Sequence, residues 1–329
     1  MSPTRAAPRP KPGATALLLV ETPFQLMCAY EVIQEFGLDH TLVLRMTGVG
    51  RNDLQLREAA SVLGLAHTEI TVRVGRHNAD TILALPRLLP PLLRRYDHLF
   101  LGSYFSRFIM AVGRVVRAAN TWLLDDGMAT FLAQDRLAAG GGKPRNLATF
   151  FAVSPLQGQT VLRHEFSRLA SLNAVTYSDE ALFIGQPLVE LGLASRSDYR
   201  DILAACQSEA AGRMIYVPHR REDPEHVEAI GKDLGVDVVY PSLPVELHFL
   251  RKGVVPRRVY TCTSTAAFAF AGRFPRCDVA MLPSLMMNAI PHAPAVLDYA
   301  RTIANIRIVD MIDSTRNARS AAEKGAASG

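Results

Sequence analysis

Short apolar runs alternate with amphipathic segments along most of this chain, and this alternation limits the folds that it can adopt. From Ala14 to about Asp126 the apolar runs are ATALLLV, TLVLRM, TEITVRV, DHLFLG and NTWLLDD. Helical patterns separate them at 24–36, 52–63, 80–94 and 105–117. Apolar runs of roughly 4–8 residues between helices predict parallel βα units. Their continuous apolarity is typical of strands that helices cover on both faces.

The second half of the chain repeats this pattern after a glycine-rich loop at 140–146 and an expected helix at 157–172. A strand ending in ALFIG at Gly185 comes first, and RMIYVPH, VDVVYP, RRVYTCTS and CDVAMLP follow as strands. The helices between them are DPEHVEAIGKDLG, SLPVELHFLRKG and TAAFAFAGR. The pattern therefore predicts an α/β protein with two Rossmann-like parallel-sheet domains facing each other across a cleft.

The predicted domains are a first one over 14–184 and a second over 185–310. A basic arm over 1–13 and a tail over 311–329 are predicted to be disordered. The length of 329 residues fits two domains, because single cores usually stop growing below that size.

The composition narrows the class of partner. The net charge is +5, which fits general solubility, an anionic small ligand, an acidic membrane surface or nucleic acid. Arginines are scattered and aromatic residues make up only 7%, so a nucleic-acid-binding protein is disfavoured. The four cysteines form no CxxC pair, which disfavours zinc and a disulfide framework.

The sequence also bears on location. No apolar stretch has the length of a secretory signal or of a membrane span, so we expect a cytoplasmic protein. The basic N-terminal arm suggests weak peripheral contact with anionic lipid at the inner face of the membrane.

Polar side chains gather where predicted strands end. In open parallel sheets, ligands bind beyond the carboxyl ends of the strands. The candidate residues at these ends are Thr22, Pro23, Gln25, Ser103, Asp125, Asp126, His219, Thr263, Ser264 and Thr265.

The adjacent Asp125 and Asp126 have three interpretations. Paired carboxylates can bind magnesium, but neighbours on a strand point to opposite sides and would not easily share one ion. One of them can cap the helix that begins at Met128 or Ala129. One of them can instead be a general base that takes a proton from an attacking hydroxyl.

Three further candidates also have a structural and a functional interpretation. His219 is either a surface histidine or, with the arginines after it and the helix that Pro224 opens, part of an anion site. Thr263, Ser264 and Thr265 either cap a helix or bind an anion. Glu246 either complements a helix dipole or accepts two ribose hydroxyls.

The ordered set DDG, IGQPL, YVPHRRE, SLPVE and TST resembles the bacterial lipooligosaccharide sialyltransferases of glycosyltransferase family 52, which are related to the bacterial polysialyltransferases. The segment ETPFQLMCAYEVI is similar to the first strand-to-helix turn of that family, and the resemblance spans roughly 17–268. It implies a two-domain GT-B fold and an inverting, metal-independent transfer from CMP-sialic acid to a glycan or glycolipid hydroxyl, with no cofactor and no metal ligand.

The resemblance also implies roles for particular residues. An aspartate of Asp125–Asp126 is the base, with Asp125 preferred. His219 meets the donor phosphate and assists the departure of CMP, and Glu246 holds the cytidine ribose. Hydroxyls of the TST motif contact the phosphate. The remaining donor-side residues are Gly127, Pro218 and Arg220, and Thr22, Pro23, Gln25 and Ser103 are expected on the acceptor or cleft side.

One position departs from the family pattern. The proline expected after His219 is Arg220, so an element that would fix the loop backbone is absent. Arg220 can instead contact the phosphate or the sugar carboxylate. Two alternatives follow: the same fold with another nucleotide-sugar donor, and a catalytically degenerate protein that only binds glycans.

Overall fold

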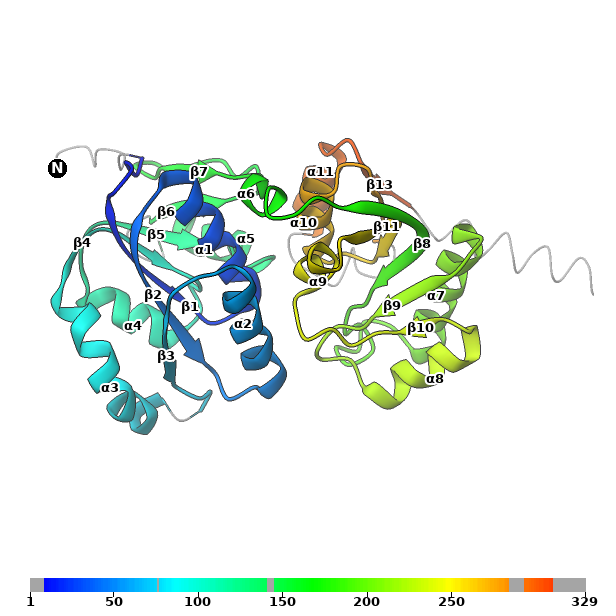
Figure 1. The fold of residues 1–329 in the computed structure, drawn as a ribbon, viewed down its shortest axis with the longest axis horizontal. Helices are drawn as coiled ribbons and strands as arrows, with labels where there is room; N and C mark the ends of the chain where they lie inside the picture. The colour runs from blue at the N-terminus through cyan, green and yellow to red at the C-terminus, as the bar shows by residue number, and fades with distance from the viewer. Residues whose placement is uncertain (1–8, 76, 141–144, 284–292, 310–329) are drawn as a thin grey trace, which may run out of the picture. The chain divides into compact units, whose positions relative to one another are not determined.

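The computed structural model describes residues 9–75, 77–140, 145–283 and 293–309 (Figure 1). The chain forms two compact units. Unit 1 comprises Met1–Ala174 and Ser242–Arg251, and unit 2 comprises Val175–Pro241 and Lys252–Gly329. Residues 1–8 of the expected arm, most of the glycine-rich loop and all of the expected tail lie outside the described residues.

Unit 1 is built on a parallel sheet. Within the described residues it has seven strands in the order β3-β2-β1-β4-β5-β6-β7. They are β1 (Thr15–Val20), β2 (Asp39–Met46), β3 (Thr68–Thr71), β4 (Arg95–Leu101), β5 (Arg117–Leu124), β6 (Asn146–Thr149) and β7 (Val161–Arg163). The helices are α1 (Pro23–Phe36), α2 (Gly50–Val62), α3 (His77–Leu93), α4 (Arg107–Val115), α5 (Ala129–Ala138) and α6 (Ser167–Ala170).

The turn from β1 into α1 shows how the sequence sets these elements. Residues 16–20 of β1 are all buried, as expected for a central strand. Thr22 then caps α1 by accepting from the Gln25 backbone N–H, and Pro23 begins the helix. Gly37 ends it in the left-handed conformation that glycine adopts without strain.

Unit 2 has the same topology. Its six described parallel strands run in the order β10-β9-β8-β11-β12-β13. They are β8 (Thr176–Ile184), β9 (Met214–Val217), β10 (Asp237–Val238), β11 (Val254–Thr261), β12 (Asp278–Met281) and β13 (Ile306–Ile308). The helices are α7 (Arg196–Ala210), α8 (Pro224–Leu234), α10 (Ala266–Arg273) and α11 (Ala293–Arg301). Both orders match the doubly wound pattern, so the prediction of two parallel-sheet α/β domains is confirmed.

The units divide the chain differently from the predicted boundary at 184/185. Strand β8 belongs to unit 2 because it pairs with β9 on one side and with β11 on the other. Helix α9 (Val245–Lys252) belongs to unit 1 except for its last residue, although it lies far along the second half of the sequence. Its neighbours there include Gln55, which donates to the Leu243 carbonyl, and Asn173, which donates to the Leu250 carbonyl.

One predicted helix is wrong. Most of the segment 157–172 is not helical, because Val161–Arg163 forms β7 beside β6 and only Ser167–Ala170 is helical. The reason is pairing with a strand that the sequence pattern does not reveal.

Candidate functional site

In each unit the strand order reverses once, and ligands of this fold class bind beyond such a reversal. In unit 1 it lies between β1 and β4. The Gln25 side chain is completely buried there: its Oε1 accepts from the Glu21 backbone N–H at 2.9 Å, and its Nε2 donates to Asp126 Oδ1 at 2.7 Å. Ser103 is buried in the loop after β4. The structure therefore brings Gln25 and Asp126 together, while Thr22 and Pro23 start the helix beside them.

Asp125 and Asp126 point in different directions, as predicted for neighbours on a strand. Asp126 is half-buried and lines a small pocket with Tyr104, Leu124 and Ala133. Between them and α5 stands Gly127, whose φ of 61° is left-handed and favours glycine. Of the two aspartates, Asp126 is the one with exposed surface.

Asp125 has no exposed surface. One carboxylate oxygen accepts from the Thr149 and Thr130 hydroxyls at 2.6 and 3.1 Å, and the other accepts from the Phe150 backbone N–H at 2.7 Å. Burial raises the pKa of Asp125 to about 7, although these hydrogen bonds oppose the shift. These contacts disfavour Asp125, the aspartate preferred from the sequence, as the group that touches an acceptor.

Neither aspartate occupies the N-cap position of α5. That residue is Met128, whose side chain makes no capping hydrogen bond, and the Ala129 backbone N–H donates to the Asp126 backbone carbonyl. Asp125 instead ties β5 to the segment after β6, since Thr149 ends that strand.

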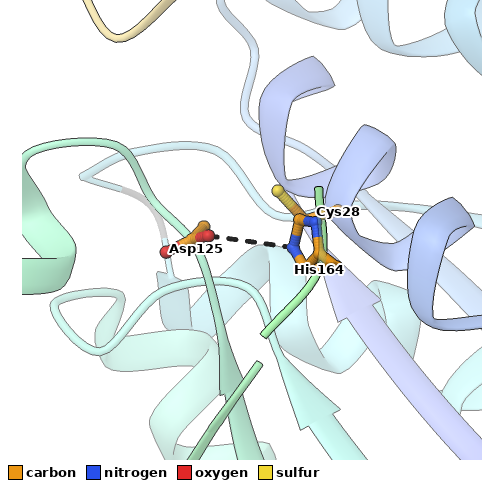
Figure 2. A group of neighbouring side chains, drawn as sticks. All are labelled: Cys28, Asp125 and His164. Carbon is orange, nitrogen blue, oxygen red and sulfur yellow. Dashed lines mark ion pairs between the residues drawn. The ribbon is translucent and has the colours of Figure 1, made fainter. Parts of the chain in front are cut away.

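A thiol, a carboxylate and an imidazole meet behind the acidic pair (Figure 2). The ligand atoms of Cys28 from α1, Asp125 and His164 all lie within 4.8 Å of one another, and His164 Nε2 is 3.8 Å from Asp125 Oδ2. Neither nitrogen of His164 has a hydrogen-bond partner, and burial lowers the pKa of His164 to about 3. A structural zinc site holds four ligands at roughly 2.0–2.3 Å, whereas this cluster supplies three separated donors. All three side chains are buried, so the cluster lies inside unit 1.

Sequence reasoning missed a polar network at the same end of the unit 1 sheet. Arg45 of β2 pairs with Glu21 at 2.5 Å and donates to the Ser106 hydroxyl at 3.0 Å. Ser106 also donates to Glu21, and Asn52 donates to the Glu21 backbone carbonyl. Glu21 follows β1 directly, so its place after a strand was the signal that could have identified it.

Glu246 lies in the first turn of α9 and is 7% exposed. Burial raises its pKa to about 7. Its segment, Ser242–Arg251, belongs to unit 1. The structure thus groups Glu246 with residues of unit 1 and not with the donor-side residues of unit 2.

In unit 2 the strand order reverses between β8 and β11. Gln186, which follows β8, accepts from the Thr263 backbone N–H at 2.5 Å, and its amide nitrogen lies 3.4 Å from the Thr263 hydroxyl. Ser264 and Thr265 are half-buried before α10, and the Ser264 hydroxyl accepts from the Ala266 N–H. The Thr263–Thr265 motif therefore lies at the reversal point of unit 2, and the sequence had left it as either a helix cap or an anion site.

The loop after β9 holds His219 half-buried, between the buried Pro218 and the exposed Arg220. Its Nδ1 accepts from the Arg221 backbone N–H at 3.2 Å, so the neutral ring carries its proton on Nε2. Glu222 fixes this loop, because its carboxylate accepts from the His219 backbone N–H and from the Tyr216 hydroxyl. Burial raises the pKa of Glu222 to about 7.

Glu222, Gln186 and Tyr216 were not predicted. Glu222 and Gln186 stood inside the quoted segments YVPHRRE and IGQPL, so their proximity to the candidate residues was the available signal.

Comparisons with known proteins bear on the fold. No protein-family model and no curated protein matches the sequence. The UDP-GlcNAc 2-epimerase of Methanocaldococcus jannaschii is 10% identical, with 90% of this chain and 88% of that chain covered and a TM-score of 0.52. The S. aureus MnaA–UDP structure is 11% identical, with 90% and 84% covered and a TM-score of 0.55. The E. coli heptosyltransferase WaaC is 11% identical, with 90% and 92% covered and a TM-score of 0.48. At such identities the two higher-scoring similarities show the fold alone, and the chain has the two-domain GT-B architecture that was predicted.

Proposed function

We propose that this protein is an inverting, metal-independent glycosyltransferase that transfers sialic acid from CMP-sialic acid to a hydroxyl of a glycan acceptor. The observation that carries the proposal is the placement of Thr263, Ser264 and Thr265 at the strand-order reversal of unit 2. A donor phosphate in this class of fold is bound at that place. The chain-long similarity to a protein solved with UDP supports a nucleotide-sugar ligand.

Asp126 is the proposed general base. Its carboxylate is partly exposed, and the hydrogen bond from Gln25 Nε2 fixes its orientation. A base must come within hydrogen-bond reach of the acceptor hydroxyl, and the buried Asp125 does not. Asp125 then acts as a positioning residue, because its contacts with Thr149 and Thr130 hold the end of β5 in place.

His219 is the proposed group that assists departure of CMP. With Nδ1 engaged by the Arg221 N–H, its Nε2–H can donate to the leaving phosphate. The Ser264 hydroxyl and the start of α10 offer further donors for the anion. Arg220 is exposed and can pair with the carboxylate of the sugar. Glu246 is the proposed partner of the cytidine ribose.

Calorimetric titration with CMP, UMP, UDP, GMP and ADP, with and without EDTA, tests the donor. Selective binding of CMP that EDTA leaves unchanged supports the proposal. Selective binding of UMP or UDP would support a nucleotide-sugar enzyme whose donor is a uridine nucleotide sugar and not CMP-sialic acid. No nucleotide binding contradicts a transferase and favours a glycan-binding protein.

A transfer assay with CMP-sialic acid and a panel of glycan acceptors then tests the base. Asp126→Asn should lower kcat at least 100-fold while CMP affinity is kept, and the exposed Asp39→Asn is the matched control. A fully active Asp126→Asn protein together with an inactive but folded Asp125→Asn protein would transfer the role to Asp125.

A further inference from the structure

Helix α3 turns large apolar side chains outward. Leu83, Leu93 and Ile82 are 77%, 76% and 70% exposed, the three highest values for large apolar side chains among the described residues. The inner face of the helix is apolar too, because Ala84 and Leu88 are buried in the core of unit 1. The helix is therefore apolar on both faces, whereas a surface helix of a water-soluble domain normally has polar residues on its outer face.

The exposed side chains form one continuous face. At 3.6 residues per turn, Ile82, Leu89 and Leu93 lie in line along the helix, with Leu85 and Leu83 on either side. Figure 1 shows α3, in cyan, at the outside of unit 1, where it packs on β3 and α4. The outward face therefore has no covering element among the described residues of its unit.

Positive charge borders this apolar face. Arg87 is exposed on α3, the exposed Arg94 directly follows the helix, and Arg95 starts β4. Arg95 is paired in register with Arg117 of β5, which is also exposed. No aspartate or glutamate occurs between residues 80 and 97. The face thus combines apolar side chains with uncompensated arginines.

We propose that this face of α3 docks unit 1 on an anionic phospholipid surface. An apolar helix face bordered by arginine is the composition of helices that lie in the plane of a membrane interface. No described helix has the length and apolarity needed to cross a bilayer, so α3 rests on the surface. Pairing with a second copy of the same face would bring the arginines of both copies together, which disfavours self-association.

Vesicle co-sedimentation of the full chain tests this surface without donor or acceptor, so its outcome is independent of the proposed transfer reaction. We expect binding to vesicles with 30% phosphatidylglycerol, about tenfold weaker binding to pure phosphatidylcholine, and weakening by 0.5 M salt. Leu83→Asp with Leu93→Asp should lower the affinity for the anionic vesicles at least tenfold.

The matched control changes two exposed leucines elsewhere, Leu172→Asp with Leu191→Asp, which alters the net charge equally. Arg87→Gln with Arg94→Gln should remove the preference for anionic lipid, whereas Arg257→Gln with Arg276→Gln should keep it. Circular dichroism confirms that each variant is folded. Equal vesicle binding by the α3 leucine variant and its control overturns the proposal, as does a dimer that dissociates only when Leu83 and Leu93 are replaced.

Discussion

Gly102 is the position where a single methyl group should disturb the candidate site most directly. An alanine Cβ there would lie 2.3 Å from Gln25 Oε1, 2.8 Å from Gln25 Cδ and 2.9 Å from the Leu19 backbone oxygen. The Leu19 oxygen is fixed in β1 and accepts from the Gly102 N–H at 2.8 Å. The Gln25 carboxamide must therefore move by about 1 Å to restore ordinary contact.

Such a movement breaks both hydrogen bonds of the Gln25 side chain. The bond with the Glu21 N–H is worth about 1 kcal/mol, and the bond to the Asp126 carboxylate about 2 kcal/mol. Gly102→Ala should therefore lower the free energy of unfolding by about 3 kcal/mol. Because Asp126 also loses its orienting partner, kcat should fall about 100-fold.

Urea unfolding and the transfer assay measure the two effects. Gly212→Ala is the matched control, because its Cβ would have nothing nearer than the Ala210 carbonyl oxygen at 3.8 Å. In a Gln25→Ala background, Gly102→Ala should lower the free energy of unfolding by a smaller amount, because only the close contact with the Leu19 oxygen remains. If Gly102→Ala and Gly212→Ala unfold at the same urea concentration, the described packing of Gln25 is refuted.

Three further predictions concern buried groups. The raised pKa values near 7 mean that Asp125, Glu222 and Glu246 favour the folded state most at low pH, and this stability is lost as the pH rises from about 4 to 7. The free energy of unfolding of the wild-type protein should therefore decrease between pH 5 and 7. In Glu246→Gln this decrease should be smaller by up to about 1.4 kcal/mol per pH unit, which urea unfolding measures. Gly185→Ala places a Cβ 2.2 Å from Glu222 Oε2 and should weaken CMP binding at least tenfold in calorimetry, because it displaces the loop of His219. His164→Phe removes two unpartnered buried nitrogens and should leave the unfolding free energy unchanged or raise it by about 1 kcal/mol, whereas a drop of several kcal/mol would show that the imidazole is needed.

The alternation of apolar runs predicted most of the fold, because central strands and their helices are determined by local pattern. The expected strand TLVLRM lies in β2, and the expected helix at 52–63 is α2 shifted by a residue or two. Of the two edge strands of unit 1, β3 was predicted within TEITVRV, whereas β7 was not. Strand β7 has three residues, and only its pairing with β6 makes it a strand.

The candidate site could likewise be predicted only in part. Its place at the strand ends follows from chain order alone, so His219, Asp126 and Thr263 could be named. The distinction between Asp125 and Asp126 could not, because it depends on partners such as Thr149, which lies 24 residues further along the chain. The location of Glu246 could not be predicted either, since no local pattern records which unit a helix joins.

The membership of Ser242–Arg251 in unit 1 affects how the protein is made. During synthesis the ribosome completes residues up to Ala174 well before α9 emerges. In that interval, surface that Leu247, Phe249 and Leu250 would cover is still open to water, since all three are buried in the finished protein. Unit 1 therefore cannot reach its final state until the first segment of unit 2, Val175–Pro241, has been translated. Separate expression of the two halves of the sequence should yield an N-terminal half prone to aggregation, unless residues 242–251 are supplied with it.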